Sequence, residues 1–465
     1  MNTVIGRFLG FFLVPFYTNK FSPDDYGIIT IIYSYIAILN VFFSAGLESG
    51  FMKFYSSPES GSKKQNFSNP LEIVLLNSFF LSILIYFFSD DLTTVFQVSG
   101  SYSYLIKYSA LILFFDTIVL IPFAFLRINN KAFKFSGIKI VNITVNVILN
   151  VILISFFNFG IEAVFISNLI ASIITLIMLF PVIKENFTFG FNKELIKELL
   201  KFSIPYIPAG ISANLIQIID RPVLKYLTDD KTVGIYTANY KLGIFMLLIV
   251  SMFEFAWRPF FLNNAREPDA KEIFSKVMTL FISAAGFIFL VISFFISDIV
   301  ELKLPYNFNL IGKAYWSGLN IVPVILFSYL LYGIYINLMA GIQIEKKTKY
   351  LPLITGTAAF VNITSNFILI PEYSYMGAAV ATLLSYFVMM AGIYYFAQKY
   401  YYIKYEFSKI GFAFVYIIGL SAIAIYLHYS GNLNFIFKII LISAYLLLIH
   451  FSKIINLKSL RNIFG

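Results

Sequence analysis

Lysines and arginines fall into every second gap between the apolar stretches of this 465-residue chain. About fourteen such stretches are present, each close to the twenty or so residues that a helix needs to cross a bilayer. The odd-numbered gaps hold few basic residues, namely Lys20, Lys225, Lys231, Lys303 and Lys313. Because positive charge in short loops stays on the cytoplasmic side, the pattern predicts a polytopic membrane protein with both ends in the cytoplasm.

The composition agrees with a membrane protein. Hydrophobic residues make up 59% of the chain and charged residues 12%, which is too apolar for a soluble protein of this length. The net charge of +10 is spread over many short loops, so it fits topology and anionic lipid headgroups and argues against a nucleic-acid partner. The chain has no cysteine and only two histidines, so we expect no disulfide, no metal site and no cofactor.

The apolar stretches predict an all-α fold, and the gaps between them are too short for a folded domain outside the membrane. The segment Lys193–Lys201 predicts an amphipathic helix at the cytoplasmic surface that connects two halves. We therefore expect an N-terminal six-helix bundle (1–183), the connector (184–202), a C-terminal six-helix bundle (203–400), and two further helices with a cytoplasmic tail (401–465). The predicted spans lie near 2–20, 26–52, 70–89, 104–126, 136–157, 161–183, 203–226, 233–260, 273–298, 317–342, 350–370, 376–398, 408–428 and 432–452.

Two short repeats support the division into halves. Val141–Asn146 (VNITVN) recurs as Val361–Asn366 (VNITSN), and Asp24–Ile28 and Asp229–Ile235 both carry two acids followed by Gly-Ile at the start of a long helix. Six spans in each half give both halves the same orientation. The repeats therefore predict two parallel bundles around a central cavity.

Ionisable side chains within the apolar stretches are candidates for the site, because each costs about 2.5–3.5 kcal/mol at bilayer depth. Most of them lie in the first two helices of each half, as a cleft between two bundles requires. An end-of-span position that lets the stem reach the headgroups is the alternative for Lys53 and Arg258, and a local helix break beside Pro222 is the alternative for Asp220. The candidates are Arg7, Glu48, Lys53, Lys107, Asp116, Asp220, Arg221, Lys241, Glu254 and Arg258.

Prolines mark the first helix of each half. Pro205 and Pro208 open the seventh span, and Pro15 lies in the first. Proline interrupts the hydrogen-bond ladder of a helix, and interrupted helices at matching places in two repeats point to a substrate site or a gate. An ordinary kink is the alternative interpretation.

No enzyme motif is found in the sequence. The phosphate-binding Gly-x-x-x-x-Gly-Lys-Ser/Thr loop, the Gly-x-Ser-x-Gly elbow and His-Glu-x-x-His are all missing. We expect a protein that is not an enzyme, and a transporter without a nucleotide site needs an ion gradient or the downhill flow of its substrate.

Several segments resemble, in order and spacing, oligosaccharide flippases of the Wzx type, in the multidrug, oligosaccharidyl-lipid and polysaccharide exporter superfamily. The resemblance covers roughly the whole chain, although the chain begins closer to Arg7 than is usual for such proteins. The segments are Arg7–Gly10, Pro15, Asp25–Ile28, Gly46–Leu47 and Lys53–Tyr55 in the first half, and Lys201–Pro208, Asp220–Arg221, Val233–Lys241 and Phe255–Phe260 in the second.

This resemblance implies movement of an undecaprenyl-pyrophosphate-linked oligosaccharide from the cytoplasmic to the outer leaflet of a bacterial cytoplasmic membrane. Arg7, Lys53, Lys241 and Arg258 are then candidates for contact with the pyrophosphate. Asp220 and Glu254 are candidates for coupling to H⁺ or Na⁺, and a polysaccharide polymerase is a possible partner.

Two other functions stay open. A cation-coupled multidrug exporter shares the fold, and a membrane polysaccharide polymerase is the enzymatic alternative. Polymerases usually carry a large outer loop with catalytic arginines, whereas no outward loop here exceeds roughly twenty residues, which is too short for a folded domain.

Overall fold

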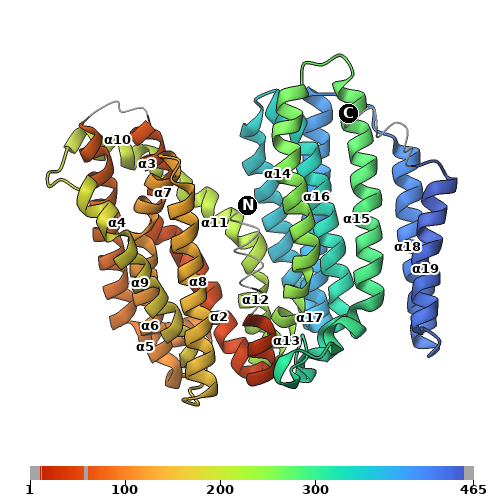
Figure 1. Ribbon diagram of the computed structural model, residues 1–465, viewed down its shortest axis with the longest axis horizontal. Helices are drawn as coiled ribbons and strands as arrows, with labels where there is room; N and C mark the ends of the chain where they lie inside the picture. Colours follow the sequence, from red (N-terminus) through yellow and green to blue (C-terminus); the bar gives the residue numbers. More distant parts are fainter. Residues whose placement is uncertain (1–10, 12, 57–60, 455–465) are drawn as a thin grey trace. The chain divides into compact units, whose positions relative to one another are not determined.

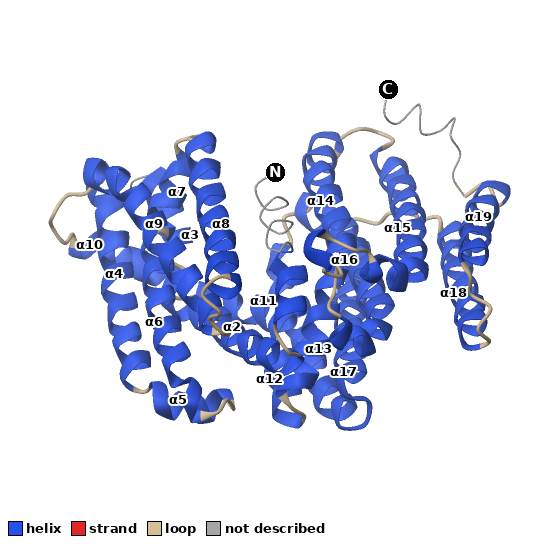
Figure 2. Ribbon diagram, turned by 60° about the horizontal axis from the view of Figure 1, so that its bottom comes forward, coloured by secondary structure: helices blue, strands red, loops and turns tan. Residues whose placement is uncertain are grey.

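The computed structural model describes Phe11, residues 13–56 and residues 61–454, and this part of the chain is almost entirely helical (Figures 1 and 2). Within these described residues, ten helical stretches are long and apolar enough to cross a membrane, and one of them, Thr348–Tyr400, contains two expected spans. The seventh expected span consists of two shorter helices, and the fourteenth is the 17-residue helix Phe435–Phe451. Most of the first span lies outside the described residues. The predicted all-helical membrane fold is confirmed.

The helices form two compact units. The first unit contains Lys20–Gly234, and the second contains Val14–Asn19 together with the chain from Ile235 onward. The boundary therefore falls inside one helix, α13 (Asp230–Tyr240). The seventh span packs on α2 within the first unit. The division at residue 203 and the central cavity stay predictions.

In the first unit, two predicted spans are divided by short breaks. The second span breaks where Ala45 and Gly46 adopt left-handed backbone angles, with φ of 47° and 68°. The fourth breaks at Val119, between two helices. The helices are α2 (Pro23–Ser44), α3 (Leu47–Ser56), α4 (Lys63–Phe87), α5 (Ser89–Phe96), α6 (Ser103–Ile118), α7 (Leu120–Ile128), α8 (Ala132–Ser155), α9 (Glu162–Asn186), α10 (Lys193–Ser203), α11 (Tyr206–Ile218), α12 (Asp220–Leu227) and the start of α13.

The connector α10 is amphipathic, as the sequence predicts. Leu195 and Leu199 are buried against Phe54 of α3, whereas the lysines and glutamates of the helix lie at least partly on its surface. The side chain of Asn192 accepts hydrogen bonds from the backbone N–H groups of Glu194 and Leu195, which caps the helix. The connector is thus a folded part of the first unit.

The second unit continues from α13 through a short 3₁₀ turn. Its further helices are α14 (Ile244–Asn264), α15 (Ala270–Glu301), α16 (Val322–Ile344), α17 (Leu351–Tyr400), α18 (Phe407–Tyr429) and α19 (Phe435–Phe451), with 3₁₀ helices η2 (Lys241–Gly243), η3 (Pro305–Asn307), η4 (Lys313–Ile321) and η5 (Thr348–Tyr350). Figure 1 shows α18 and α19 beside α15, on which both pack.

The end of the first span is anchored in this second unit. The amide of Asn19 donates to the carbonyl oxygen of Asn309 at 2.7 Å and accepts from its N–H at 3.1 Å. The N–H of Gly312 donates to Thr18 Oγ1 at 3.1 Å. A side chain at Gly312 would overlap the backbone of Thr18, so this junction requires glycine.

Helix α17 contains two spans joined by a reversal at Ser374, whose φ and ψ are 51° and −133°. The reversal brings Gly377 so close to the backbone of Leu369 and Ile370 that a side chain at position 377 would overlap it. At the other end, the ring of Tyr350 stacks on Phe396 with 4.5 Å between centroids. The two predicted spans, 350–370 and 376–398, are therefore the arms of one helical hairpin.

Candidate functional site

Of the six ionisable residues with a predicted role, Lys53 and Asp220 lie in the first unit. Lys53 is on α3, and its Nζ lies 4.7 Å from the ring centroids of both Phe54 and Phe202. Such cation–π contacts hold an exposed ammonium in place. The side chain thus connects α3 to the connector α10, with its charge still on the surface.

Asp220 is completely buried, at the first position of α12. The seventh span is interrupted twice, at Ile204–Pro205 and at Ile219. The first interruption lies where Pro205 predicts it, and Pro208 lies in the first turn of α11, where the missing N–H is tolerated. The second places the Asp220 carboxyl at a helix N-terminus, which favours negative charge.

Arg7 lies outside the described residues. Pro15 is buried in a helical segment that is continuous over residues 13–20. The amide of Asn19 donates to the carbonyl oxygen of Pro15 at 2.7 Å, in addition to its bond with Asn309. The described residues around Pro15 therefore contain no break in the helix, and its role in gating stays a prediction.

In the second unit, Lys241 begins the 3₁₀ turn η2 that divides the eighth span. Its side chain is exposed. Gly243, two residues later, packs so closely on α16 that a methyl group there would lie 2.6 Å from Ile325 and 2.9 Å from Tyr329. A short 3₁₀ stretch within a helix often marks a hinge, so Lys241 lies on an irregular segment that is fixed against α16.

Glu254 and Arg258 lie four residues apart in α14, so their side chains leave the same face of the helix. Arg258 is exposed and Glu254 is partly buried. Trp257, on the adjoining part of the helix surface, is buried against α16, and its Nε1 donates to the carbonyl oxygen of Asn337 at 3.3 Å. The ring therefore fixes the rotation of α14 and thereby the direction of Glu254 and Arg258.

A polar cluster in the first unit includes Asp116, an ionisable candidate within a span to which the sequence assigns no role. Asp116 of α6 accepts a 2.6 Å hydrogen bond from Ser172 of α9, and its carboxylate interacts electrostatically with Lys139 of α8. One turn away, Asn142 donates to Thr175 at 2.9 Å. That bond between helices is what the polar Val-Asn-Ile-Thr repeat within a span indicates. Glu48 of α3, another candidate without an assigned role, pairs with Arg127 of α7, and the sequence does not predict this partner.

The two Asp-Asp-…-Gly-Ile repeats meet in the first unit. A methyl group on Gly27 would lie 2.7 Å from the carbonyl carbon of Asp230 and overlap its oxygen, and one on Gly234 would lie 2.8 Å from the carbonyl carbon of Pro23. Pro23 and Asp230 each precede the glycine of their own helix by four residues. The contact is thus reciprocal, and the first turns of α2 and α13 cross with their backbones touching.

Side chains near this contact form hydrogen bonds and an ion pair at the first turns of α2 and α13. Ser22 caps α2 by accepting from the Asp25 N–H at 3.2 Å. Asp229 accepts from the Thr232 N–H at 2.7 Å, and this bond holds the pKa of the Asp229 carboxyl below its usual value. Lys225 pairs with Asp230 at 2.7 Å. We call Pro23–Gly27 and Asp230–Gly234 the glycine crossing.

Comparisons with known proteins agree on one family. The profile of the polysaccharide biosynthesis protein family, Polysacc_synt, matches residues 1–265, more than half of the chain. A similar curated protein is the capsular polysaccharide biosynthesis protein CapF of Staphylococcus aureus, 27% identical over 350 residues that cover 71% of this chain and 81% of CapF.

Solved structures with a similar fold are membrane transporters. The lipid II flippase MurJ, in an inward closed conformation, superposes with a TM-score of 0.75 at 18% identity and 96% coverage of both chains. An inward-facing multidrug resistance MATE family transporter of the MOP superfamily gives 0.66 at 12% identity, with 86% of this chain and 94% of the transporter covered. These matches confirm the predicted resemblance, and the chain belongs to the polysaccharide biosynthesis protein family, with the fold of MOP-superfamily transporters.

Proposed function

We propose that this protein moves an undecaprenyl-pyrophosphate-linked oligosaccharide from the cytoplasmic to the outer leaflet by alternating access. The family match over residues 1–265 carries the proposal, and similarity to a capsular polysaccharide biosynthesis protein and to a lipid II flippase supports it. We place the protein in a bacterial cytoplasmic membrane with both ends inside, because basic residues are rare in the odd-numbered gaps.

Charged residues within the spans fit such a substrate. Sugars and pyrophosphate do not cross hydrocarbon unaided, so polar protein groups must replace their hydration. We propose that Arg7, Lys53, Lys241 and Arg258 contact the pyrophosphate, since cations form charge-assisted hydrogen bonds with phosphate oxygens. Asp220 and Glu254 are proposed to couple transport to H⁺ or Na⁺, and a polysaccharide polymerase is proposed to use the product.

The glycine crossing and the breaks in the spans are proposed as the moving parts. Alternating access needs contacts that form in one state and separate in another. A backbone contact between two glycines is suited to this role because no side chains must interdigitate again when it closes. The breaks at Pro205, Ile219 and Lys241–Gly243 allow the seventh and eighth spans to bend, and Pro15 and Pro208 are proposed to contribute to gating.

Deletion of the gene tests the proposed substrate. We expect lipid-linked repeat units to accumulate on the cytoplasmic leaflet and surface polysaccharide to be lost, and a plasmid copy to restore both. Leaflet position is measured by the access of a glycosidase to inverted and right-side-out vesicles. If surface polysaccharide stays intact and sensitivity to cationic dyes rises instead, the protein is a multidrug exporter, the alternative supported by the MATE-like fold.

A further inference from the structure

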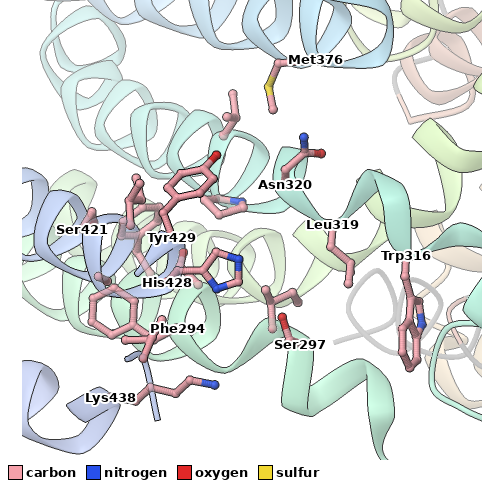
Figure 3. A pocket seen from close by; sticks show the side chains of 18 of the residues that line it. Phe294, Ser297, Trp316, Leu319, Asn320, Met376, Ser421, His428, Tyr429 and Lys438 are labelled. Carbon is pink, nitrogen blue, oxygen red and sulfur yellow. The ribbon is translucent and has the colours of Figure 1, made fainter. Parts of the chain in front are cut away.

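The second unit contains a cavity that the proposed transport site does not use. It has a volume of about 810 Å³ and lies at the ends of α15, α18 and η4 and at the beginnings of α16 and α19 (Figure 3). By the distribution of basic residues, these helix ends face outward. Trp316 and Tyr429 line the cavity, and such rings are typical of the membrane–water interface.

Three polar side chains that line this cavity can form hydrogen bonds with a ligand. Ser293 Oγ is buried and has no hydrogen-bond partner within the described part of the chain. The exposed side chains of Asn320 and Ser297 also face the cavity (Figure 3). Because a buried hydroxyl without a partner costs free energy, an amphiphile that supplies a hydrogen bond here is favoured over hydrocarbon alone.

The charge at the cavity is balanced. Lys438, which is only 8% exposed, forms an ion pair with Asp298. Its positive charge is therefore already compensated before any ligand arrives. A phosphate would have to displace Asp298, whereas an uncharged headgroup with hydroxyl groups would not.

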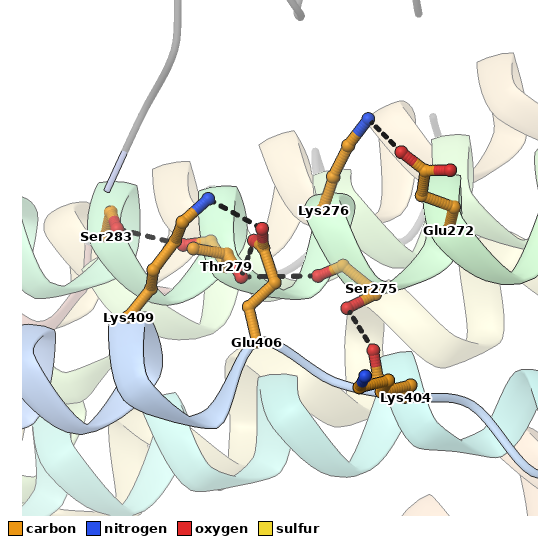
Figure 4. Close-up of polar contacts among 8 residues, drawn as sticks. All are labelled: Glu272, Ser275, Lys276, Thr279, Ser283, Lys404, Glu406 and Lys409. Atoms are coloured by element: carbon orange, nitrogen blue, oxygen red, sulfur yellow. Dashed lines mark hydrogen bonds and ion pairs between the residues drawn. The ribbon is translucent and has the colours of Figure 1, made fainter. Parts of the chain in front are cut away.

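Hydrogen bonds also hold together the helices that line the cavity, at positions away from the cavity itself. Ser275 of α15 donates to the carbonyl oxygen of Lys404 at 2.9 Å, and Thr279 donates to Glu406 at 2.8 Å, just before α18 begins (Figure 4). Tyr445 of α19 donates to the carbonyl oxygen of Ser283 at 2.9 Å. These bonds hold α18 and α19 against α15, so the cavity is a built feature of this unit.

We propose that this cavity binds a diacyl glycolipid of the outer leaflet. Its uncharged sugar hydroxyls bond Ser293, Ser297 and Asn320, and one acyl chain lies along Phe289, Phe294 and Val324, which line the apolar part of the wall. The volume is within the range of about 300–1,000 Å³ found for small-molecule sites. This inference does not depend on what the protein transports.

Lipid retention by the full-length protein tests the proposal. The protein is reconstituted in phosphatidylethanolamine nanodiscs that contain equal amounts of diglucosyl diacylglycerol, phosphatidylglycerol and phosphatidylcholine with the same acyl chains. Native mass spectrometry of the released protein is expected to show the glycolipid enriched at least threefold over phosphatidylglycerol, about the effect of one neutral hydrogen bond. Equal retention of phosphatidylglycerol, retention only of an added undecaprenyl-pyrophosphate glycolipid, or no retained lipid would overturn the proposal.

Matched substitutions assign the retained lipid to this cavity. Ser293→Ala and Asn320→Ala are each expected to lower glycolipid retention about threefold to tenfold, whereas Ser408→Ala and Asn432→Ala, which lie outside the cavity, leave it unchanged. Ser293→Ala removes a hydroxyl without a partner, so the Tm of lipid-depleted protein should not fall. Asp298→Asn leaves the charge of Lys438 uncompensated and is expected to shift retention toward phosphatidylglycerol. If the cavity variants match their controls, the proposed site is wrong.

Discussion

Gly27→Ala and Gly234→Ala are each expected to abolish complementation of a deletion strain, whereas Gly137→Ala and Gly356→Ala leave it intact. An added methyl group overlaps the opposing backbone at the glycine crossing, but at positions 137 and 356 it meets nothing within 4 Å. Overpacking of this kind costs about 1–3 kcal/mol even where side chains can yield, and here the neighbour is backbone. Alanine is the better helix former, so a lost helix does not explain the defect.

The double variant and a distance measurement test whether the defect comes from the loss of this contact. Because both methyl groups disrupt one contact, the double variant should be little worse than either single one. The chain has no cysteine, so Asp24→Cys and Lys231→Cys place a pair of spin labels on α2 and α13 of the otherwise unchanged protein. A longer label distance in Gly27→Ala, with normal abundance in the membrane, is expected. Full complementation by both alanine variants would show that the crossing need not form.

Lys241→Ala and Arg258→Ala are each expected to reduce transport of a pyrophosphate-linked glycolipid by about tenfold or more. A hydrogen bond to a charged group contributes about 1.5–3 kcal/mol, and removal of one cation leaves phosphate oxygens without that partner. Lys241→Arg retains the charge and should keep part of the activity. Transport is measured in proteoliposomes with a fluorescent substrate analogue, after membrane abundance and Tm are shown to be normal.

An uncharged substrate analogue provides the control for this second prediction. The analogue lacks the pyrophosphate, so the wild-type protein should transport it slowly. The Lys241→Ala variant should transport it at the same rate as the wild-type protein. Lys276→Ala removes a lysine that is paired with Glu272 on the surface of α15, and it should change neither activity. If Lys241→Ala lowers transport of both analogues equally, the lysine acts on the fold or on the hinge and not on phosphate.

Much of the fold can be predicted because the positions of the spans follow from local hydropathy and their orientation follows from the basic residues in the adjoining loops. The α17 hairpin shows this well, since the sequence predicts its two spans at 350–370 and 376–398 and the reversal occurs at Ser374. The break at Pro205 and the amphipathic connector α10 follow in the same way from proline and from residue spacing. Each of these features is encoded within about twenty neighbouring residues.

Contacts between distant segments were harder to predict. The Asp-Asp-…-Gly-Ile repeat was visible in the sequence, but nothing local indicated that its two copies touch each other. Asp116, Lys139 and Ser172 come from three different helices. The pair of Glu48 and Arg127 likewise joins α3 to α7. The 3₁₀ turn at Lys241–Gly243 is set by packing on α16, and the only local signal for it is Gly243.

The reversal of α17 at a single residue leaves no spare chain at the tip of the hairpin. An epitope or reporter inserted between Tyr373 and Tyr375 has to unwind helix on both sides, because Gly377 already touches the backbone of the opposite arm. A topology map of this protein should therefore place its reporters in the segment between α9 and α10, where residues 187–192 lie outside helix. If a reporter at residue 374 gives no signal, the result would indicate a damaged hairpin and would not show on which side of the membrane this residue lies.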